Sequence, residues 1–129
     1  MENFNTEIIS PDEKILKTES SSAIIPSFEG YMGILKDHIP LVTFLRPGII
    51  EIENSNKNKK YFVEEGIVEF SNNNLLILTS TCINMSDFSN EDIKRMIQEV
   101  EKEISSNNIL DKQKYILSHK LDTLKEIRQ

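Results

Sequence analysis

Residues 27–52 read SFEGYMGILKDHIPLVTFLRPGIIEI, and this stretch decides the fold of the chain. It holds three of the four glycines and two of the four prolines, namely Gly30, Gly33, Gly48, Pro40 and Pro47. Glycine tolerates positive φ, whereas proline fixes φ and lacks a backbone donor. Their close spacing among apolar residues indicates a chain that turns sharply, pairs, and turns again.

Short segments rich in alternating or β-favouring residues lie on both sides of this stretch and within it. They cover residues 4–9, 14–19, 22–26, 28–35, 41–45, 49–53, 61–63, 67–70 and 75–83. Turn residues separate them, including a Pro47-Gly48 pair typical of a type II turn and the polar run 71–74. Strands that recur every ~8–12 residues predict an all-β sandwich or barrel.

The hydrophobic period changes after residue 86. Apolar residues then recur on one helical face, at Ile93, Met96, Ile97, Val100 and Ile104. Ser89 is the expected N-cap, with Asp92 three residues later. After the polar run 105–108, a second stripe consists of Leu110, Leu117, Leu121 and Leu124, with Ile116 and Ile127 beside them. The short link predicts an antiparallel hairpin that packs on itself and keeps some apolar surface for a partner.

We therefore predict a mainly β fold with added α structure. The N-terminal β-sandwich domain spans residues 1–86, and the C-terminal helical hairpin spans residues 87–129. The chain of 129 residues has room for one modest core and an appendage.

Composition excludes several classes of protein. The net charge of −6 argues against nucleic acid and against a basic membrane-binding surface. One cysteine, Cys82, excludes an internal disulfide framework and suits a buried thiol in a reducing compartment. No apolar run approaches the ~20 residues of a membrane span, and the acidic N-terminus resembles neither a signal nor a transit peptide.

The patterns of an enzyme are absent from the sequence. His38 and His119 are far apart and have no cysteine partners, so no metal set is evident. A phosphate-binding GxxxxGK[ST] loop is missing, and Gly30-x-x-Gly33 is too short for a dinucleotide fingerprint. Asp37-His38 is not accompanied by a nucleophile elbow. The residues favour a binding or structural module, and a hydrolase is the weakest alternative.

The order of several motifs resembles a known family. The motifs are Glu29-Gly30, Gly33-Ile34, His38-x-Pro40-Leu41-x-Thr43 and Pro47-Gly48, then 66–70, 78–79 and 81–83. Together they resemble the signature of the epsilon subunit of F-type ATP synthase over nearly the whole chain. Where that family often has a proline before its His-x-Pro segment, this chain has Lys36-Asp37.

The resemblance implies a flattened ten-stranded β-sandwich followed by a two-helix hairpin. It implies a non-catalytic central-stalk subunit that binds the gamma subunit and the c ring, turns with them, and couples proton flow to ATP synthesis. The residues expected to contact the c ring or gamma are Glu29, Gly30, Tyr31, Met32, Gly33, His38 and Pro40. The loops 29–33 and 36–38 are expected at one end of the sandwich, facing the c ring. The motifs leave open whether the driving ion is a proton or sodium.

The resemblance also implies a place in the cell and a role for the hairpin. The chain is expected at the cytoplasmic face of a bacterial inner membrane, held there by its partners; an organelle-encoded chain is the other source that fits. In the family, the hairpin restrains ATP hydrolysis when it opens and climbs along gamma. The basic residues of the tail would then meet the alpha and beta catalytic subunits; they are Lys112, Lys114, Lys120, Lys125 and Arg128.

No cofactor is expected, apart from a regulatory ATP. Some bacterial members of the family bind ATP on the hairpin through an I/L-D-x-x-R-A motif. Asp92 and Arg95 keep its charged pair, whereas Glu91 and Met96 replace the flanking residues. A simple ion pair one helical turn apart is the alternative reading of Asp92 and Arg95.

One alternative class stays open on sequence alone. A freestanding β-sandwich binding module whose helices form a homodimer would show the same periodicities. An epsilon subunit should be monomeric by itself and join gamma on mixing, so a size measurement separates the two classes.

Overall fold

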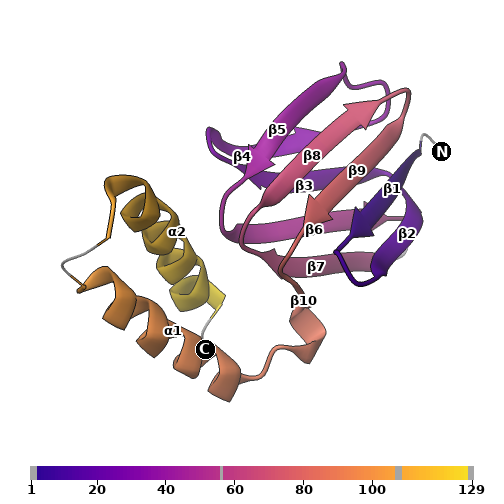
Figure 1. The fold of residues 1–129 in the computed structure, drawn as a ribbon. Coiled ribbons are helices and arrows are strands. Elements are labelled where there is room, and N and C mark those ends of the chain that lie inside the picture. The colour runs from indigo at the N-terminus through magenta and orange to yellow at the C-terminus, as the bar shows by residue number, and fades with distance from the viewer. Residues whose placement is uncertain (1–2, 56, 107–108, 128–129) are drawn as a thin grey trace.

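The computed structural model describes residues 3–55, 57–106 and 109–127. Ten strands precede two α-helices (Figure 1). The strands are β1 (Phe4–Ile9), β2 (Lys14–Ser20), β3 (Ser22–Ser27), β4 (Gly30–Ile34), β5 (Leu41–Leu45), β6 (Gly48–Asn54), β7 (Lys57–Val63), β8 (Gly66–Ser71), β9 (Asn74–Thr79) and β10 (Cys82–Asn84). A 3₁₀ turn, η1 (Met85–Asp87), leads to α1 (Asn90–Ile104) and α2 (Asp111–Ile127).

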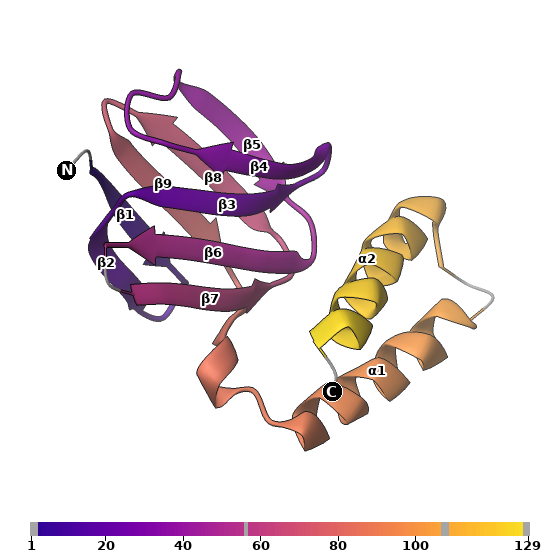
Figure 2. The same cartoon turned by 180° about the vertical axis from the view of Figure 1, so that it is seen from behind.

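The strands form one sheet that folds over into two layers (Figures 1 and 2). Its order is β10-β7-β6-β3-β5-β8-β9-β1-β2, and β4 pairs with β3 off this path. One layer contains β4, β3, β6, β7 and β10, and the other contains β5, β8, β9, β1 and β2. The layers join where Ser27 of β3 pairs with Leu45 of β5. The predicted ten-stranded sandwich with two C-terminal helices is confirmed.

The core of the sandwich consists of residues from strands alone. Alternate side chains of both layers point inward, as in β1, where Phe4, Thr6 and Ile8 are buried. Phe4 meets Phe70 of β8 edge to face, with ring centroids 5.7 Å apart. Thr6 shares a hydrogen bond of 2.8 Å with Ser20 of β2, so the polar groups buried between these strands satisfy each other.

The turn predicted at residues 71–74 is a tight hairpin between β8 and β9. Asn72 and Asn73 both have positive φ, 49° and 57°, and Ser71 pairs with Asn74. Two positive φ values define a type I′ turn, whose twist suits the flanking strands. Asparagine tolerates this conformation because its short polar side chain bonds locally.

The type II turn predicted at Pro47-Gly48 is wrong. Gly48 starts β6 with Val63 as its partner, and Gly30 is the glycine with positive φ in the described chain. Glycine is needed at position 48 because the backbone passes close to Pro26. A Cβ atom there would lie 2.6 Å from the Cβ of Pro26.

The two helices form an antiparallel hairpin at the end of the sandwich where β10 leaves it (Figure 1). The predicted cap is confirmed, since the Ser89 side chain accepts a hydrogen bond from the Asp92 N–H at 3.1 Å. The boundary predicted between residues 86 and 87 falls within η1 and stays a prediction. Leu110 is not part of the packed stripe, because it precedes α2 and is 70% exposed.

The hairpin packs against the sandwich as well as on itself. Ile49, Phe62 and Ile83 are cross-strand neighbours on β6, β7 and β10, and they form a row on the outer face of that layer. The helices cover this row, so that Phe62 is 0% exposed. The helical residues buried with it are Ile93, Ile97, Val100 and Leu124. The apolar surface that we expected to remain for a partner is thus used largely by the sandwich.

Candidate partner-binding surfaces

The outer face of the other layer is left open. Here β5, β8, β9 and β1 place the cross-strand neighbours Phe44, Ile67, Leu78 and Ile9 side by side, a set that we call the outer apolar row. Phe44 is 56% exposed, and Ile67 and Leu78 are more than 40% exposed. Apolar side chains in a contiguous exposed row are typical of a surface that another molecule covers.

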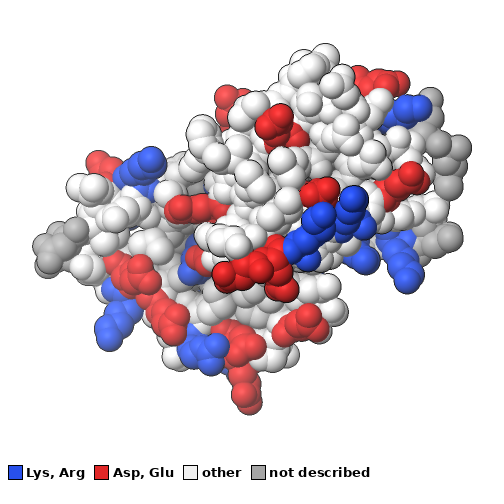
Figure 3. Space-filling model, turned by 45° about the vertical axis from the view of Figure 1, so that its right-hand side comes forward, with Lys and Arg blue, Asp and Glu red and all other residues white. Residues whose placement is uncertain are grey.

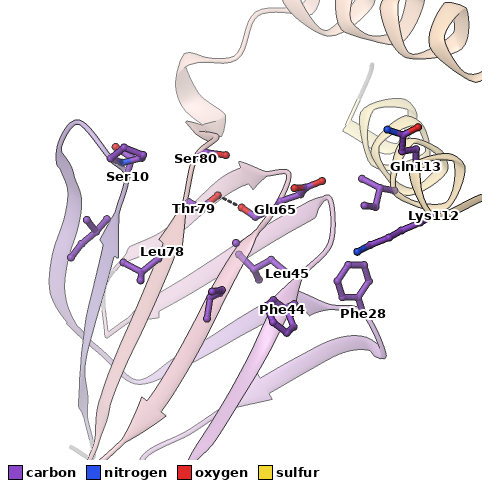
Figure 4. A pocket seen from close by; sticks show the side chains of 15 residues that line it. Ser10, Phe28, Phe44, Leu45, Glu65, Leu78, Thr79, Ser80, Lys112 and Gln113 are labelled. Atoms are coloured by element: carbon purple, nitrogen blue, oxygen red, sulfur yellow. Dashed lines mark hydrogen bonds between the residues drawn. The ribbon is translucent and has the colours of Figure 1, made fainter. Parts of the chain in front are cut away.

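A groove of about 720 Å³ runs between the outer apolar row and the first turns of α2. Figure 4 shows Lys112 reaching from the helix toward Phe28, with Phe44 below it on β5. The rim is rigid, because the Thr79 hydroxyl donates a hydrogen bond of 2.6 Å to the backbone oxygen of Glu65. The groove therefore has one wall on the sheet and one on the hairpin.

The sequence patterns missed this surface, although a signal for it exists. Residues 41–45, 67–68 and 75–78 are apolar at nearly every position, so both faces of these strands carry apolar side chains. A strand with one wet face normally alternates with polar residues, whereas a strand covered on both faces does not. Pro40, Val42 and Phe44 follow one another on the exposed face, which makes the predicted Pro40 continuous with the outer apolar row.

The first predicted contact loop is the turn between β3 and β4. Gly30 has a φ of 128°, a conformation that other residues rarely adopt, and its carbonyl accepts a 2.7 Å hydrogen bond from Ser27 Oγ. Glu29 beside it is exposed. Tyr31 is half exposed, yet its hydroxyl accepts a hydrogen bond of 3.2 Å from the Ile49 N–H. This turn is a firmly held projection.

Met32 and Gly33 continue β4, which is an edge strand paired with β3. Met32 packs partly against the core. Gly33 pairs with Ile24 and does not have positive φ, and a Cβ added to it would meet no atom within 4 Å. Our expectation that replacing Gly33 disturbs the chain depended on a positive φ, and that condition is not met.

The second predicted loop, residues 35–40, lies at the opposite end of β4. His38 packs edge to face against Phe70, with centroids 5.8 Å apart, and its Nδ1 donates to the Ile39 carbonyl at 2.7 Å. Asp37 has a φ of 66° and is bonded to Asn73 of the β8–β9 turn. The expectation that both loops lie at one end of the sandwich is therefore wrong, because a strand of five residues separates Gly30 from His38.

The hairpin is docked against the corner where β5 turns into β6. The Tyr115 hydroxyl donates to the Phe28 carbonyl at 3.1 Å, and the Thr123 hydroxyl donates to the Pro47 carbonyl at 3.4 Å. Lys120 forms an ion pair with Glu64, and both side chains are mostly buried. The contacts fix α2 along its length and complete the wall of the groove.

The basic residues predicted to meet the catalytic subunits differ in this docked state. Lys112 and Lys114 are exposed, Lys120 is engaged with Glu64, and Lys125 lies 4.0 Å from Glu101 of α1. Arg128 lies outside the described residues. Lys120 is thus part of the docking interface rather than a free cation.

Asp92 and Arg95, the candidate nucleotide-binding pair, bond to each other. Arg95 Nη2 lies 3.1 Å from Asp92 Oδ1, one helical turn away, and both residues lie toward solvent on α1. Pairs of this kind stabilise a helix by ~0.2–0.5 kcal/mol. The ion-pair reading accounts for the contact, and nucleotide binding stays a prediction.

Burial controls the two titratable groups between β7 and β10. It raises the pKa of the Cys82 thiol to about 11 and also raises the pKa of Tyr61. Both groups are neutral at pH 7. Within the described ranges, no three histidine, cysteine or acidic side chains are grouped to hold a metal ion. Neither described helix has the length and hydropathy needed to cross a membrane.

Charges of both signs are mixed on the surface. On the face in Figure 3, lysine and arginine side chains lie among aspartate and glutamate side chains, with uncharged surface between them. Such a surface does not have the concentrated positive field that nucleic-acid binding requires.

Comparison with known proteins gives one family. Residues 3–85 match the family model described as ATP synthase, Delta/Epsilon chain, beta-sandwich domain. An ATP synthase epsilon chain of Pelagibacter ubique is 42% identical over 98% of both chains. One of Parvibaculum lavamentivorans is 33% identical over 98% of this chain and 96% of its own.

The fold has counterparts among solved structures. A chain from the Euglena gracilis mitochondrial ATP synthase, in a structure of OSCP/F1/c-ring in rotational state 1, superimposes with a TM-score of 0.83 and 22% identity. That match covers 98% of this chain and 81% of the other. A chain from the central stalk/c-ring of the Tetrahymena thermophila enzyme gives a TM-score of 0.65 and 12% identity, covering 97% and 96%.

Proposed function

The chain belongs to the ATP synthase epsilon-chain family, and on that premise we propose that it is a non-catalytic subunit of the central stalk. It binds the gamma subunit and the c ring, turns with them, and helps to couple proton translocation to ATP synthesis. It is peripheral, held by these partners at the cytoplasmic face of a bacterial inner membrane. Its relatives named above are bacterial epsilon chains.

The outer apolar row is the observation that carries the proposal. Phe44, Ile67 and Leu78 expose apolar area on a flat, rigid sheet, and a monomer gains nothing from that arrangement. We assign this surface, continued through Val42 and Pro40, to gamma. Burying it contributes ~25 cal/mol for each Å² removed from water.

The c ring is assigned to the turn that carries Glu29, Gly30 and Tyr31, with Met32 and Gly33 behind it. This turn projects from the sandwich on a bonded backbone, so it can present its side chains without first being ordered. His38 is given a different role. Its ring supports Phe70 and the loop that leads to Pro40, so it positions the gamma-binding surface from below.

The hairpin is assigned a regulatory role. Docked, it buries its apolar stripes on Phe62 and its neighbours; extended, it would bury them on a longer partner such as gamma. Lys112 and Lys114 would then face the alpha and beta subunits. Deletion of residues 88–129 should raise ATP hydrolysis by the assembled complex and leave synthesis nearly intact.

A regulatory ATP on α1 is part of the same proposal. It would have to compete with the ion pair between Asp92 and Arg95. Arg95→Gln should then weaken ATP binding to the purified chain measured by calorimetry, whereas Lys94→Gln on the same turn should not. Equal heats for both variants and for the unmodified chain would count against an ATP site here.

The experiment that tests the main proposal is capture of the chain by the organism's own gamma subunit. Phe44→Asp places a charge in the outer apolar row and should abolish capture. Ile24→Asp, on the outer face of the opposite layer and 39% exposed, is the matched control and should bind normally. Circular dichroism checks that both variants fold.

Two results would overturn the assignment. Capture of Phe44→Asp at unmodified strength would remove gamma from the outer apolar row. A stable homodimer of the unmodified chain that Phe44→Asp dissociates would support the freestanding, self-associating module instead.

A further inference from the structure

One contact between α2 and the sandwich depends on the charge state of a side chain. Arg46, at the corner between β5 and β6, places Nη1 3.3 Å from Nε2 of His119 on α2. A guanidinium has only donors and stays charged at any ordinary pH. The imidazole nitrogen that faces it must therefore offer a lone pair, so His119 is neutral when the helix is docked.

The surroundings of His119 hold it in that position. The ring of Tyr115, one turn earlier on α2, lies against the imidazole with centroids 4.5 Å apart. Arg46 is fixed from its other side by the Tyr31 ring, whose centroid is 5.8 Å from the guanidinium carbon. The cation therefore cannot easily turn away if the imidazole becomes charged.

The charged groups around His119 act in opposite directions. Burial and the Arg46 guanidinium lower the pKa of His119, whereas Asp122 on the same helix raises it, and the sum is a pKa below the ordinary value. Lys120 nearby is compensated by its own partner, Glu64. Since the docked state disfavours the charged imidazole, docking is strongest above the pKa of the free residue and weakens as the pH falls below it.

We propose that His119 and Arg46 form a pH-sensitive latch, in which the neutral imidazole holds the N-terminal half of α2 on the sandwich and its protonation releases that half. Protonation removes the acceptor for Arg46 and leaves two cations in contact. The contacts that follow are those of Tyr115, including its hydrogen bond to the Phe28 carbonyl.

Release acts on one end of the helix. Leu124, at the other end of α2, is 0% exposed in the cluster around Phe62, and it anchors the helix without a titratable group. The released end carries Lys112, Gln113 and Ile116, which form the helical wall of the groove. Acidification thus widens the groove and leaves the base of the hairpin in place. This property belongs to the isolated chain and does not depend on its partners.

Nuclear magnetic resonance on the purified chain tests the latch. The sequence has two histidines, so a His38→Gln variant leaves His119 as the only imidazole to titrate. We expect His119 to titrate below the ordinary histidine pKa of about 6.5. Over the same range, the nuclear Overhauser contact between the Phe28 and Tyr115 rings, whose centroids are 5.9 Å apart, should be lost. The contact between Phe62 and Phe88 should persist.

Two substitutions separate the latch from general acid unfolding. Arg46→Gln removes the cation, so the His119 pKa should rise. His119→Gln supplies an amide oxygen that accepts from Arg46 at every pH, so the Phe28–Tyr115 contact should no longer depend on pH. The latch is overturned if that contact survives full protonation of His119, or if it is lost at the same pH in His119→Gln. A His119→Gln chain that is undocked at every pH also overturns it, because packing of the imidazole would then be what holds the helix.

Discussion

Phe62 of β7 and Leu124 of α2 are both fully buried in one apolar cluster, although they belong to different layers of the protein. The core of the sandwich proper contains neither of them. The molecule therefore has two cores: one between the sheet layers, and one between a sheet face and the hairpin. A hairpin that shares only the second core can leave without opening the first.

A chain that ends at Asp87 should still unfold cooperatively in urea. The first core is built from strands alone, so it survives the loss of the helices. The row of Ile49, Phe62 and Ile83 becomes exposed, and each fully uncovered large side chain forgoes ~1.5–3 kcal/mol of burial. We expect a lower urea midpoint and strong binding of the dye ANS, which the full chain should not show. A gradual, non-cooperative transition would mean that the helices are part of a single core.

Gly48→Ala should destabilise the protein by about 1–3 kcal/mol, because the new Cβ would lie 2.6 Å from the rigid ring of Pro26. Gly33→Ala is the matched control. Its Cβ enters open space without positive φ, so the expected change is a stabilisation of no more than about 1 kcal/mol. Chemical denaturation of both variants makes the comparison. Equal destabilisation would show that the two sites differ less than their backbones indicate.

Lys120→Glu should loosen the docked hairpin, since it places two carboxylates together at a mostly buried contact. We expect faster amide exchange in α2, with a loss of at least about 1 kcal/mol of protection. Adding Glu64→Lys restores opposite charges and should restore protection. Lys114→Glu, at an exposed site on the same helix, should leave exchange unchanged and is the variant suited to test contacts with the catalytic subunits. Failure of the charge swap to rescue protection would argue against the pair.

Cys82 should react slowly with iodoacetamide in the folded protein. Its pKa is raised from 9.0 to about 11, so at pH 8 the reactive thiolate is roughly 100-fold scarcer than for a free thiol. Because folding favours the neutral thiol, this contribution to stability is complete below pH 9 and is lost as the pH rises toward about 11. The alkylation rate should keep climbing with pH past 9 in buffer and level off near 9 in urea. Matching profiles in the two solvents would contradict the burial of the thiol.

The sequence by itself determined the features that depend on neighbours along the chain. Alternation and turn residues predicted the strands, and the positive φ values of Asn72 and Asn73 are a local preference of asparagine. The change of period after residue 86 predicted the helices, and Ser89 caps the first of them as expected. These features are decided within a few residues, where side-chain chemistry acts directly on the backbone.

Tertiary structure decided which apolar faces are covered. Phe62 and Phe44 both point outward from strands that are apolar on both faces, yet the hairpin buries Phe62 and leaves 56% of Phe44 exposed. It also placed Gly30 and His38 at opposite ends of β4, and it brought Gly48 against Pro26 and His119 against Arg46. Strand order and layer closure bring together residues distant in the chain, and periodicity carries no record of them. The physical reason is that a pattern reports which way a side chain points, whereas burial depends on what lies opposite.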